Sequence, residues 1–212
     1  MFNGQLEKII KRRRSIRRYK PDPPPEEWIE RILEATKWAP SPSNLQPVRY
    51  IRIRSKDIKE KLRDEMNRGK ERLLKSLDVS NSSKKLKRWI EVYYSRYSIF
   101  MFDAPVLFVV GIQKDKKGFY ERIAQLNPAI NYNRESVLDI SVGISICHFI
   151  LMAEQMGLGT CILTTPFIFI EDINKLLCID TINFKCFITL GFPAESPYPP
   201  EKNSISDIYI QI

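Results

Sequence analysis

The feature that most constrains the fold is the apolar segment SVLDISVGISICHFILMAEQMG, which spans residues 136–157. It predicts a long helix that ends at Gly157, a residue that commonly caps helices. Apolar residues lie on every side of this helix, and a helix of that kind must be buried. Gly143, Ser141 and Ser145 would let another element approach closely. Burial within one chain satisfies the requirement, but the core of an intertwined dimer accounts for it more easily.

The other apolar segments predict a sheet with helices around it. Three short runs are typical of strands buried on both faces, namely residues 104–112, 160–164 and 185–192. Residues 48–55 alternate apolar and basic side chains, as in a strand. Helical spacing covers residues 2–11, 26–39 and 56–100, with a break at 78–83. Residues 113–134 look irregular and the tail after Gly191 extended. This order predicts one α+β domain over residues 1–212.

The net charge of +9 is concentrated in two segments. Residues 1–20 hold eight Lys and Arg against one Glu, and residues 49–98 hold sixteen against seven acids. A basic surface can bind nucleic acid. However, the bases of the second segment alternate with acids and apolar residues at helical spacing, which is typical of a solvated helix face. We therefore do not expect nucleic-acid binding to be the main role.

Two further features concern the compartment. The longest uncharged apolar stretch, residues 140–153, is shorter than the roughly 20 residues that span a bilayer. The four cysteines lie in or beside apolar runs and form no C-x-x-C pair, which favours buried, reduced thiols. We expect a soluble cytoplasmic protein with no membrane contact and no metal site.

Most sequence motifs of catalysis are missing. There is no G-x-G-x-x-G, no phosphate-binding G-x-x-x-x-G-K-[ST], no H-E-x-x-H and no G-x-S-x-G. His148 is the only histidine, and it lies inside the apolar helix, where a core role is expected. No catalytic side chain can be assigned. If the chain is an enzyme, a bound cofactor supplies the chemistry.

The stretch RRRSIRRY, residues 12–19, places five arginines around Ser15. Guanidinium groups together with a hydroxyl are well suited to bind a phosphate monoester. In an extended segment, alternate side chains point the same way. This would direct Arg13, Ser15 and Arg17 at one ligand, while Arg14 and Arg18 face elsewhere. A basic turn after a helix is the alternative interpretation.

These residues also resemble a known family. RRSIRRY followed by APSPSNLQP is similar to the N-terminal motifs of the flavin-dependent nitroreductases, R-R-S-x-R-x-[FY] and A-P-S-x-x-N-x-Q-P-W. DAPVLFVVG, AEQMGLGTCIL and TLGFPAESPYPP resemble three later segments of that family, in the same order. The resemblance runs from about residue 8 to residue 208.

The resemblance implies a three-layer α+β sandwich with a central, mostly antiparallel sheet, in an intertwined homodimer that binds FMN at two interface sites. The tail from about residue 194 would then pack on the partner subunit. The FMN contacts implied by the motifs are Arg13, Arg14, Ser15 and Arg17, the loop residues Pro40, Ser41, Pro42, Ser43, Asn44 and Gln46, the turn residues Ile162, Leu163, Thr164 and Thr165, and Lys202. The loop is expected to contribute partly across the interface.

The implied activity is an oxidoreductase reaction. NADH or NADPH would reduce the flavin at N5 and leave, and a nitroaromatic, quinone or similar acceptor would follow by a ping-pong mechanism. Dehalogenation, flavin fragmentation and dehydrogenation on the same scaffold are alternatives, as is a non-catalytic flavin-binding or nucleic-acid-associated protein. Val48 and Ile162 replace aromatic residues that are common in the family, so the substrate side of the flavin is expected to differ.

Overall fold

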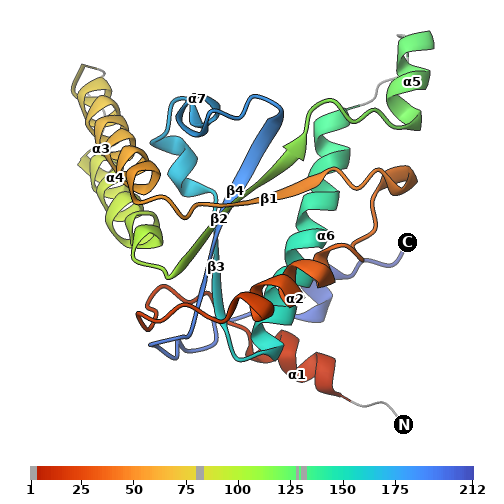
Figure 1. Cartoon of the computed structure of the whole chain (residues 1–212), viewed down its shortest axis with the longest axis horizontal. Helices are drawn as coiled ribbons and strands as arrows, with labels where there is room; N and C mark the ends of the chain where they lie inside the picture. Colours follow the sequence, from red (N-terminus) through yellow and green to blue (C-terminus); the bar gives the residue numbers. More distant parts are fainter. Residues whose placement is uncertain (1–3, 80–83, 128, 130–132) are drawn as a thin grey trace.

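A computed structural model describes residues 4–79, 84–127, 129 and 133–212. Its helices, 3₁₀ turns (η) and strands follow the sequence pattern closely (Figure 1). They are α1 Gln5–Arg12, α2 Glu26–Thr36, η1 Pro42–Asn44, β1 Val48–Arg52, α3 Lys56–Val79, α4 Lys84–Tyr97, η2 Ile99–Phe102, β2 Val106–Gln113, α5 Phe119–Leu126, α6 Arg134–Gln155, β3 Gly159–Leu163, η3 Thr165–Ile168, α7 Ile173–Leu177, β4 Ile182–Gly191 and α8 Ile205–Ile208.

Two sequence-based expectations are wrong. Residues 113–134 were expected to be irregular, yet α5 forms there. The tail was expected to be extended throughout, yet one helical turn, α8, forms near its end. Ser204 begins this turn with a capping box, in which its hydroxyl and backbone N–H both pair with Asp207. A helix of four residues is too short to show apolar periodicity, so the sequence pattern did not indicate it.

The four strands form one antiparallel sheet in the order β1-β2-β4-β3. The central strand β2 is buried along nearly its whole length, as its run of apolar residues predicts. A β-bulge shifts its pairing with β4 between Val110 and Gly111. Gly111 is required there, because a Cβ would lie 2.5 Å from the carbonyl oxygen of Asn183.

Helices cover both faces of this sheet (Figure 1). On one face, α2 and α6 pack against Phe108, Val110 and Ile188. On the other, α3, α7 and η2 enclose a second apolar cluster that includes Leu107, Val109 and Phe187, with α4 packed beside it. The chain is therefore a three-layer α+β sandwich with an antiparallel sheet, which confirms the predicted fold class.

Helix α6 is buried on one side only. Leu138, Val142 and Phe149 are buried against the sheet, whereas Ile140 is 64% exposed and Cys147 is also exposed. The prediction that the helix is buried all round is not met within a single chain. By length and composition alone α6 could cross a membrane. Its packed face lies on the sheet, and its outer side presents an apolar surface.

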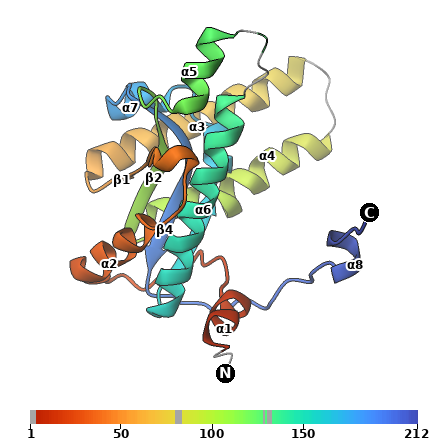
Figure 2. The ribbon, with the colours of Figure 1, turned by 90° about the vertical axis from the view of Figure 1, so that its right-hand side faces the viewer.

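The C-terminal segment extends away from the sheet (Figure 2). The C-terminal segment leaves the body after β4 and carries α8 at its far end. Ile205, Ile208 and Tyr209 are all exposed there. An apolar tail that makes no core of its own is consistent with the predicted packing on a second copy, which stays a prediction.

Candidate functional site

The arginine segment, residues 13–19 directly after α1, is hydrogen-bonded to the edge of the sheet. Ser15 pairs with Thr160 of β3 in a parallel bridge, and the Ile16 N–H donates to the Thr160 carbonyl at 2.9 Å. Tyr19 pairs in turn with Pro193, just after β4. A Cβ at Gly159 would lie 2.7 Å from the Ile16 side chain, so glycine there allows the close approach. The segment is therefore held by its backbone, which leaves its arginine side chains available.

Glu195 fixes the middle of the same segment, and its role was not anticipated from the sequence. Its Oε1 accepts hydrogen bonds from the backbone N–H of Arg17 at 2.5 Å and of Arg18 at 3.1 Å. The Ala194 N–H also donates to the Arg18 carbonyl at 2.9 Å. The P-A-E part of the tail motif was the available signal, but only the fold places it beside residues about 178 positions earlier.

The predicted phosphate-binding residues share one cavity, which we name the arginine pocket. Its volume is about 760 Å³. α6 contributes Cys147, Ile150 and Leu151 to its wall. The sequence-predicted residues that line it are Arg13, Arg14, Ser15, Arg17 and Lys202. The structure thus brings together the arginine cluster and the lysine of the tail, which are far apart in the sequence.

The family motif includes Arg14 among the FMN contacts, whereas the alternation of side chains directed it away from Arg13 and Arg17, and the expectation from alternation is wrong. Arg14 lines the arginine pocket, and its Nη1 donates to the carbonyls of Lys11 at 2.7 Å and Arg13 at 2.8 Å. The alternation rule fails because the segment turns out of α1 at Arg13 and is bridged only at Ser15 and Tyr19, so it is not a regular strand. Arg18 does face elsewhere, since it does not line this pocket.

Arg17 is the most constrained member of the cluster. Its guanidinium carbon lies 5.2 Å from the centre of the Tyr97 ring, a cation–π contact. Its Nε is buried and has no hydrogen-bond partner among the described residues. A buried donor without an acceptor costs about 1–3 kcal/mol. An anionic ligand in the pocket would relieve that cost, so the residues present fit the phosphate-bearing end of a ligand such as FMN.

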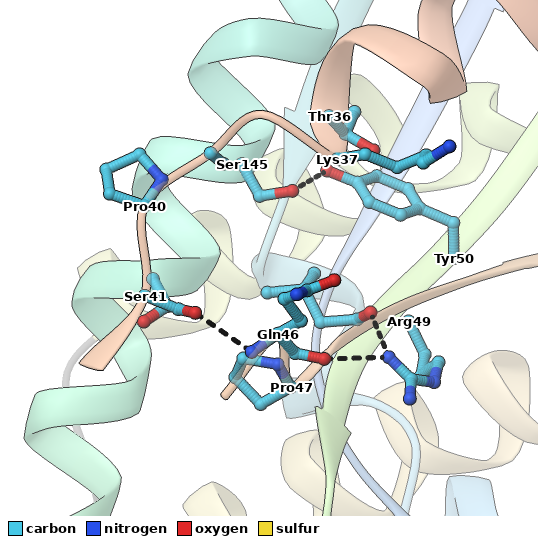
Figure 3. Close-up of a pocket in the computed structure, with 12 residues that line it drawn as sticks. Thr36, Lys37, Pro40, Ser41, Gln46, Pro47, Arg49, Tyr50 and Ser145 are labelled. Atoms are coloured by element: carbon cyan, nitrogen blue, oxygen red, sulfur yellow. Dashed lines mark hydrogen bonds between the residues drawn. The ribbon is translucent and has the colours of Figure 1, made fainter. Parts of the chain in front are cut away.

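The proline-rich loop forms a different cavity, the loop pocket, of about 130 Å³ (Figure 3). The Gln46 N–H donates to Ser41 Oγ at 2.9 Å, and Arg49 Nη1 donates to the Gln46 carbonyl at 3.0 Å. On the far wall, the hydroxyls of Tyr50 and Ser145 share a hydrogen bond of 2.9 Å. Pro40, Ser41 and Gln46 therefore face one small cavity beside α6.

The loop holds an unusual backbone. Ser43, Asn44 and Gln46 have φ values of 49°, 52° and 48°, in the left-handed region that residues with a side chain rarely adopt. Pro42 begins the short η1 turn, which includes Ser43 and Asn44. Backbone strain of this kind concentrates at ligand-binding sites. The sequence suggested a stiff loop from its prolines, but it gave no sign of the three left-handed residues.

Residues 162–165 were expected to form a turn, but Ile162 and Leu163 are the last residues of β3, and the four residues split between two environments. Ile162 and Thr164 line a hollow of about 400 Å³, the helix hollow, together with Gly143 and Cys147 on the exposed side of α6. Leu163 points to the opposite face of the sheet and is buried there, because neighbouring strand residues alternate. Thr165 is half-buried at the start of η3. A side-chain contact from Leu163 to a ligand in the hollow is therefore excluded.

Within the described residues of one chain, the three cavities are not one site. No residue lines both the arginine pocket and the loop pocket. Cys147 and Ile150 line both the arginine pocket and the helix hollow, so these two adjoin along α6. The loop residues are the part of the predicted site that a single chain leaves apart.

The remaining reactive groups do not form a catalytic cluster. His148 Nδ1 lies 3.2 Å from the Ala35 carbonyl, a structural contact between α6 and α2. Over the part of the chain that the structure describes, no group of three His, Cys, Asp or Glu residues could hold a metal ion. The site has the character of a cavity for an anionic ligand.

The cysteines correct one expectation and supply a probe. All four are free, but Cys147 and Cys178 are exposed, and only Cys161 and Cys186 are buried. Burial raises the pKa of the Cys161 thiol, and it raises the pKa of Cys186 to about 12. The sequence missed this because each exposed cysteine lies in or beside an apolar run, and only the fold shows which side of that run faces outward.

We expect Cys178 to react with an aromatic disulfide reagent at pH 8, and Cys147 to react only in chains whose α6 surface is not paired with a second copy. The thiolate is the nucleophile, so Cys161 and Cys186 should stay unreactive, because each is buried and burial raises the pKa of its thiol. Saturating FMN should slow Cys147, which lines the arginine pocket, and leave Cys178 unchanged as an internal control. Peptide mapping by mass spectrometry measures each rate. Equal protection of both cysteines would contradict the placement of the ligand.

A second prediction concerns Glu195. Glu195→Ala removes the acceptor of two backbone N–H groups, so the arginine segment should loosen and FMN should bind more weakly. Riboflavin, which lacks the phosphate, should be affected much less. Glu195→Gln keeps an acceptor oxygen and should recover most of the FMN affinity. Fluorescence titration with both flavins is the measurement, and an equal loss for the two would mean that Glu195 only supports the fold.

Comparisons with known proteins agree with this fold. An iodotyrosine deiodinase from Thermotoga neapolitana is 28% identical over 193 residues, which cover 90% of this chain and 89% of the relative. A BluB-like flavoprotein from Clostridium difficile 630 has a similar structure, with a TM-score of 0.79 at 24% identity, over 98% of this chain and 99% of the other. An NADPH:FMN oxidoreductase from Vibrio harveyi, solved with NAD⁺, has a TM-score of 0.69 at 19% identity and covers 97% and 76% of the two chains.

The family comparison covers most of the chain. Residues 10–192 match the sequence model of the Nitroreductase family, a span that begins just before the arginine segment and ends just after β4. It therefore includes the loop pocket, the sheet and the turn after β3. The conclusion from these matches and from the fold is that the chain belongs to the nitroreductase family.

Proposed function

We propose that the arginine pocket holds the phosphate and ribityl chain of FMN. The observation that carries this proposal is the convergence of the arginine cluster and Lys202 of the tail on one cavity, which is also lined by Arg17, whose buried Nε has no partner among the described residues. Arg13 and Arg14 would bind the phosphate through charge-assisted hydrogen bonds, with Ser15 as a hydroxyl donor. Lys202 would add a less directional contact from the tail.

We further propose that a second copy of the chain completes the site. The loop pocket lies apart from the arginine pocket in one chain, and both border α6, whose outer side exposes Ile140 and Cys147. Pairing that apolar surface with its symmetry mate would bury it and would bring the loop of each copy toward the other's flavin. The apolar tail beyond residue 194 would pack on the same partner.

The proposed reaction is FMN-dependent reduction of an electron-poor acceptor by NADH or NADPH. Bound FMN would supply the redox chemistry, taking a hydride at N5 and passing electrons to a nitroaromatic, a quinone or a similar acceptor. The chain's own part is binding and orientation: Thr164 and the backbone of the β3 turn face the helix hollow beside the arginine pocket. A reducing, cytoplasmic location is part of this proposal.

The test is the visible spectrum of the purified protein. It should be yellow, contain about one FMN per chain and bleach under nitrogen when NADH or NADPH is added. A bound flavin that neither nucleotide reduces would remove the reductase assignment and favour a flavin-binding protein without turnover. A colourless protein that refuses micromolar FMN would remove the cofactor assignment itself.

One alternative has an observation of its own. The similarity to iodotyrosine deiodinase extends over 90% of this chain, so reductive dehalogenation is the second candidate. Turnover of an iodinated tyrosine by the reduced protein, compared with turnover of a nitroaromatic under the same conditions, separates the two reactions. Iodide release that is faster than nitro reduction would favour the deiodinase reaction.

A further inference from the structure

A fourth cavity adjoins the proposed flavin site on the side of α4, and we name it the Arg96 pocket. Its volume is about 380 Å³. The arginine segment and the loop after β4 form one wall, and the last turn of α4 with η2 forms the other. The residues that the argument uses are Arg17, Arg18 and Glu195 on the first wall and Arg96, Tyr97 and Phe100 on the second.

This pocket carries unpaired positive charge. Within the described part of the chain, neither Arg18 nor Arg96 makes a side-chain hydrogen bond or an ion pair. Glu195 is the only acid on the wall, and its Oε1 is occupied by two backbone N–H groups. Three guanidinium groups therefore face one carboxylate that is already hydrogen-bonded, and the pocket favours an anion.

The aromatic wall restricts the kind of anion. Tyr97 and Phe100 lie beside the guanidinium groups, and the Arg17 guanidinium already stacks on the Tyr97 ring. Flat guanidinium and phenyl faces together suit a planar, conjugated ligand that carries a carboxylate. A cavity of this size bounded on two sides fits a small molecule better than a polymer surface.

Arg17 connects this pocket to the flavin site. It lines both the arginine pocket and the Arg96 pocket, so a ligand in one lies within a side chain's width of a ligand in the other. We infer that the Arg96 pocket is a binding site for an aromatic carboxylate beside the bound flavin and that it selects acidic ligands over neutral ones. This inference rests on the proposed function, because Arg17 joins the pocket to the cavity proposed for FMN.

The experiment compares two probes that differ in charge. 4-Nitrobenzoate and 4-nitrobenzamide have nearly the same shape, and neither is consumed by the oxidised holoprotein, so calorimetric titration with saturating FMN gives equilibrium dissociation constants. Wild-type protein should bind the benzoate at least about tenfold more tightly, which corresponds to about 1.4 kcal/mol. The preference should weaken with added salt, because the pocket is partly open to solvent.

The decisive variant is Arg96→Gln, which should remove most of the preference for the benzoate. Arg88→Gln is the matched control, because it removes the same charge from α4 eight residues earlier, at a position that does not line the Arg96 pocket. Arg88 and Arg96 both line a second hollow along α4, so a probe bound in that hollow would respond to both variants. Arg96→Lys should retain most of the preference, and it serves as the readout if the glutamine variant is unstable. Bound FMN and the circular dichroism spectrum check that each variant is folded.

The outcomes separate this inference from the proposed function. If the flavin is present and is reduced by NADH or NADPH but wild type binds both probes equally, the inference is wrong and the proposed function stands. Equal loss in the Arg96 and Arg88 variants would also overturn it, since net charge would then be sufficient. If Arg96→Gln instead abolishes a preference for NADPH over NADH without changing benzoate binding, the pocket recognises the nucleotide phosphate and the inference fails.

Discussion

Arg13→Ala should weaken FMN binding by about 10- to 150-fold while the protein stays folded. Arg13 lines the arginine pocket, and its loss would remove a charge-assisted contact worth about 1.5–3 kcal/mol. Its side chain is far from the two apolar clusters that stabilise the sheet, so unfolding should change little. Fluorescence titration of the apoprotein with FMN gives the affinity.

The control for Arg13 is Arg31→Ala, which removes the same charge from the exposed side of α2. It should bind FMN as the wild type does. Riboflavin provides a second control, since a phosphate contact cannot affect a flavin that has no phosphate. Unchanged FMN affinity in Arg13→Ala, or an equal loss for FMN and riboflavin, would place the phosphate elsewhere.

Phe149→Ala should lower the free energy of unfolding by about 3–5 kcal/mol. Phe149 is fully buried on α6, stacked on Tyr50 with ring centres 5.5 Å apart and edge-to-face with Phe108 at 5.6 Å. Alanine would leave a cavity between α6 and the sheet, and the surrounding rings could refill it only in part. Urea unfolding at a fixed FMN concentration measures the loss.

Phe149→Leu is the graded control, because it keeps most of the buried volume and should cost clearly less than alanine. Ile168→Ala, on the exposed surface of η3, should change stability by less than about 0.5 kcal/mol. A loss below about 1 kcal/mol for Phe149→Ala would mean that α6 does not depend on this aromatic cluster for its position, and the location of the arginine pocket wall would then need another explanation.

Much of the fold could be predicted because short stretches of sequence indicate which segments are buried and where helices begin. The run from Ala104 to Ile112 contains no charge, and only a strand covered on both faces can place it, as β2 does. Helix α2 begins after Pro25 with two glutamates in its first turn, a pattern that marks a helix start in any context. These signals lie within a few consecutive residues, so they can be read without knowing which residues lie nearby in the folded chain.

The expectations that proved wrong depend instead on contacts between distant parts of the chain. Whether Cys147 is exposed, and which side of α6 faces outward, depend on the packing of α6 against residues a hundred positions earlier. Arg14 joined the arginine pocket because the chain turns out of α1 there, which composition does not reveal. The loop of Ser43 and Asn44 was recognised as stiff, yet its left-handed backbone appears only in the folded chain.

The sequence by itself determined the layers of this protein, the candidate phosphate ligands and the family, because residue type and short-range spacing are sufficient for each. Only the tertiary structure decided that Glu195 holds the arginine segment, that Lys202 reaches the same pocket and that Arg96 lies across from Arg18. The reason is physical: a charged side chain acts on whatever lies within a few ångströms of it, and for these residues the neighbours are set by how the chain folds back on itself.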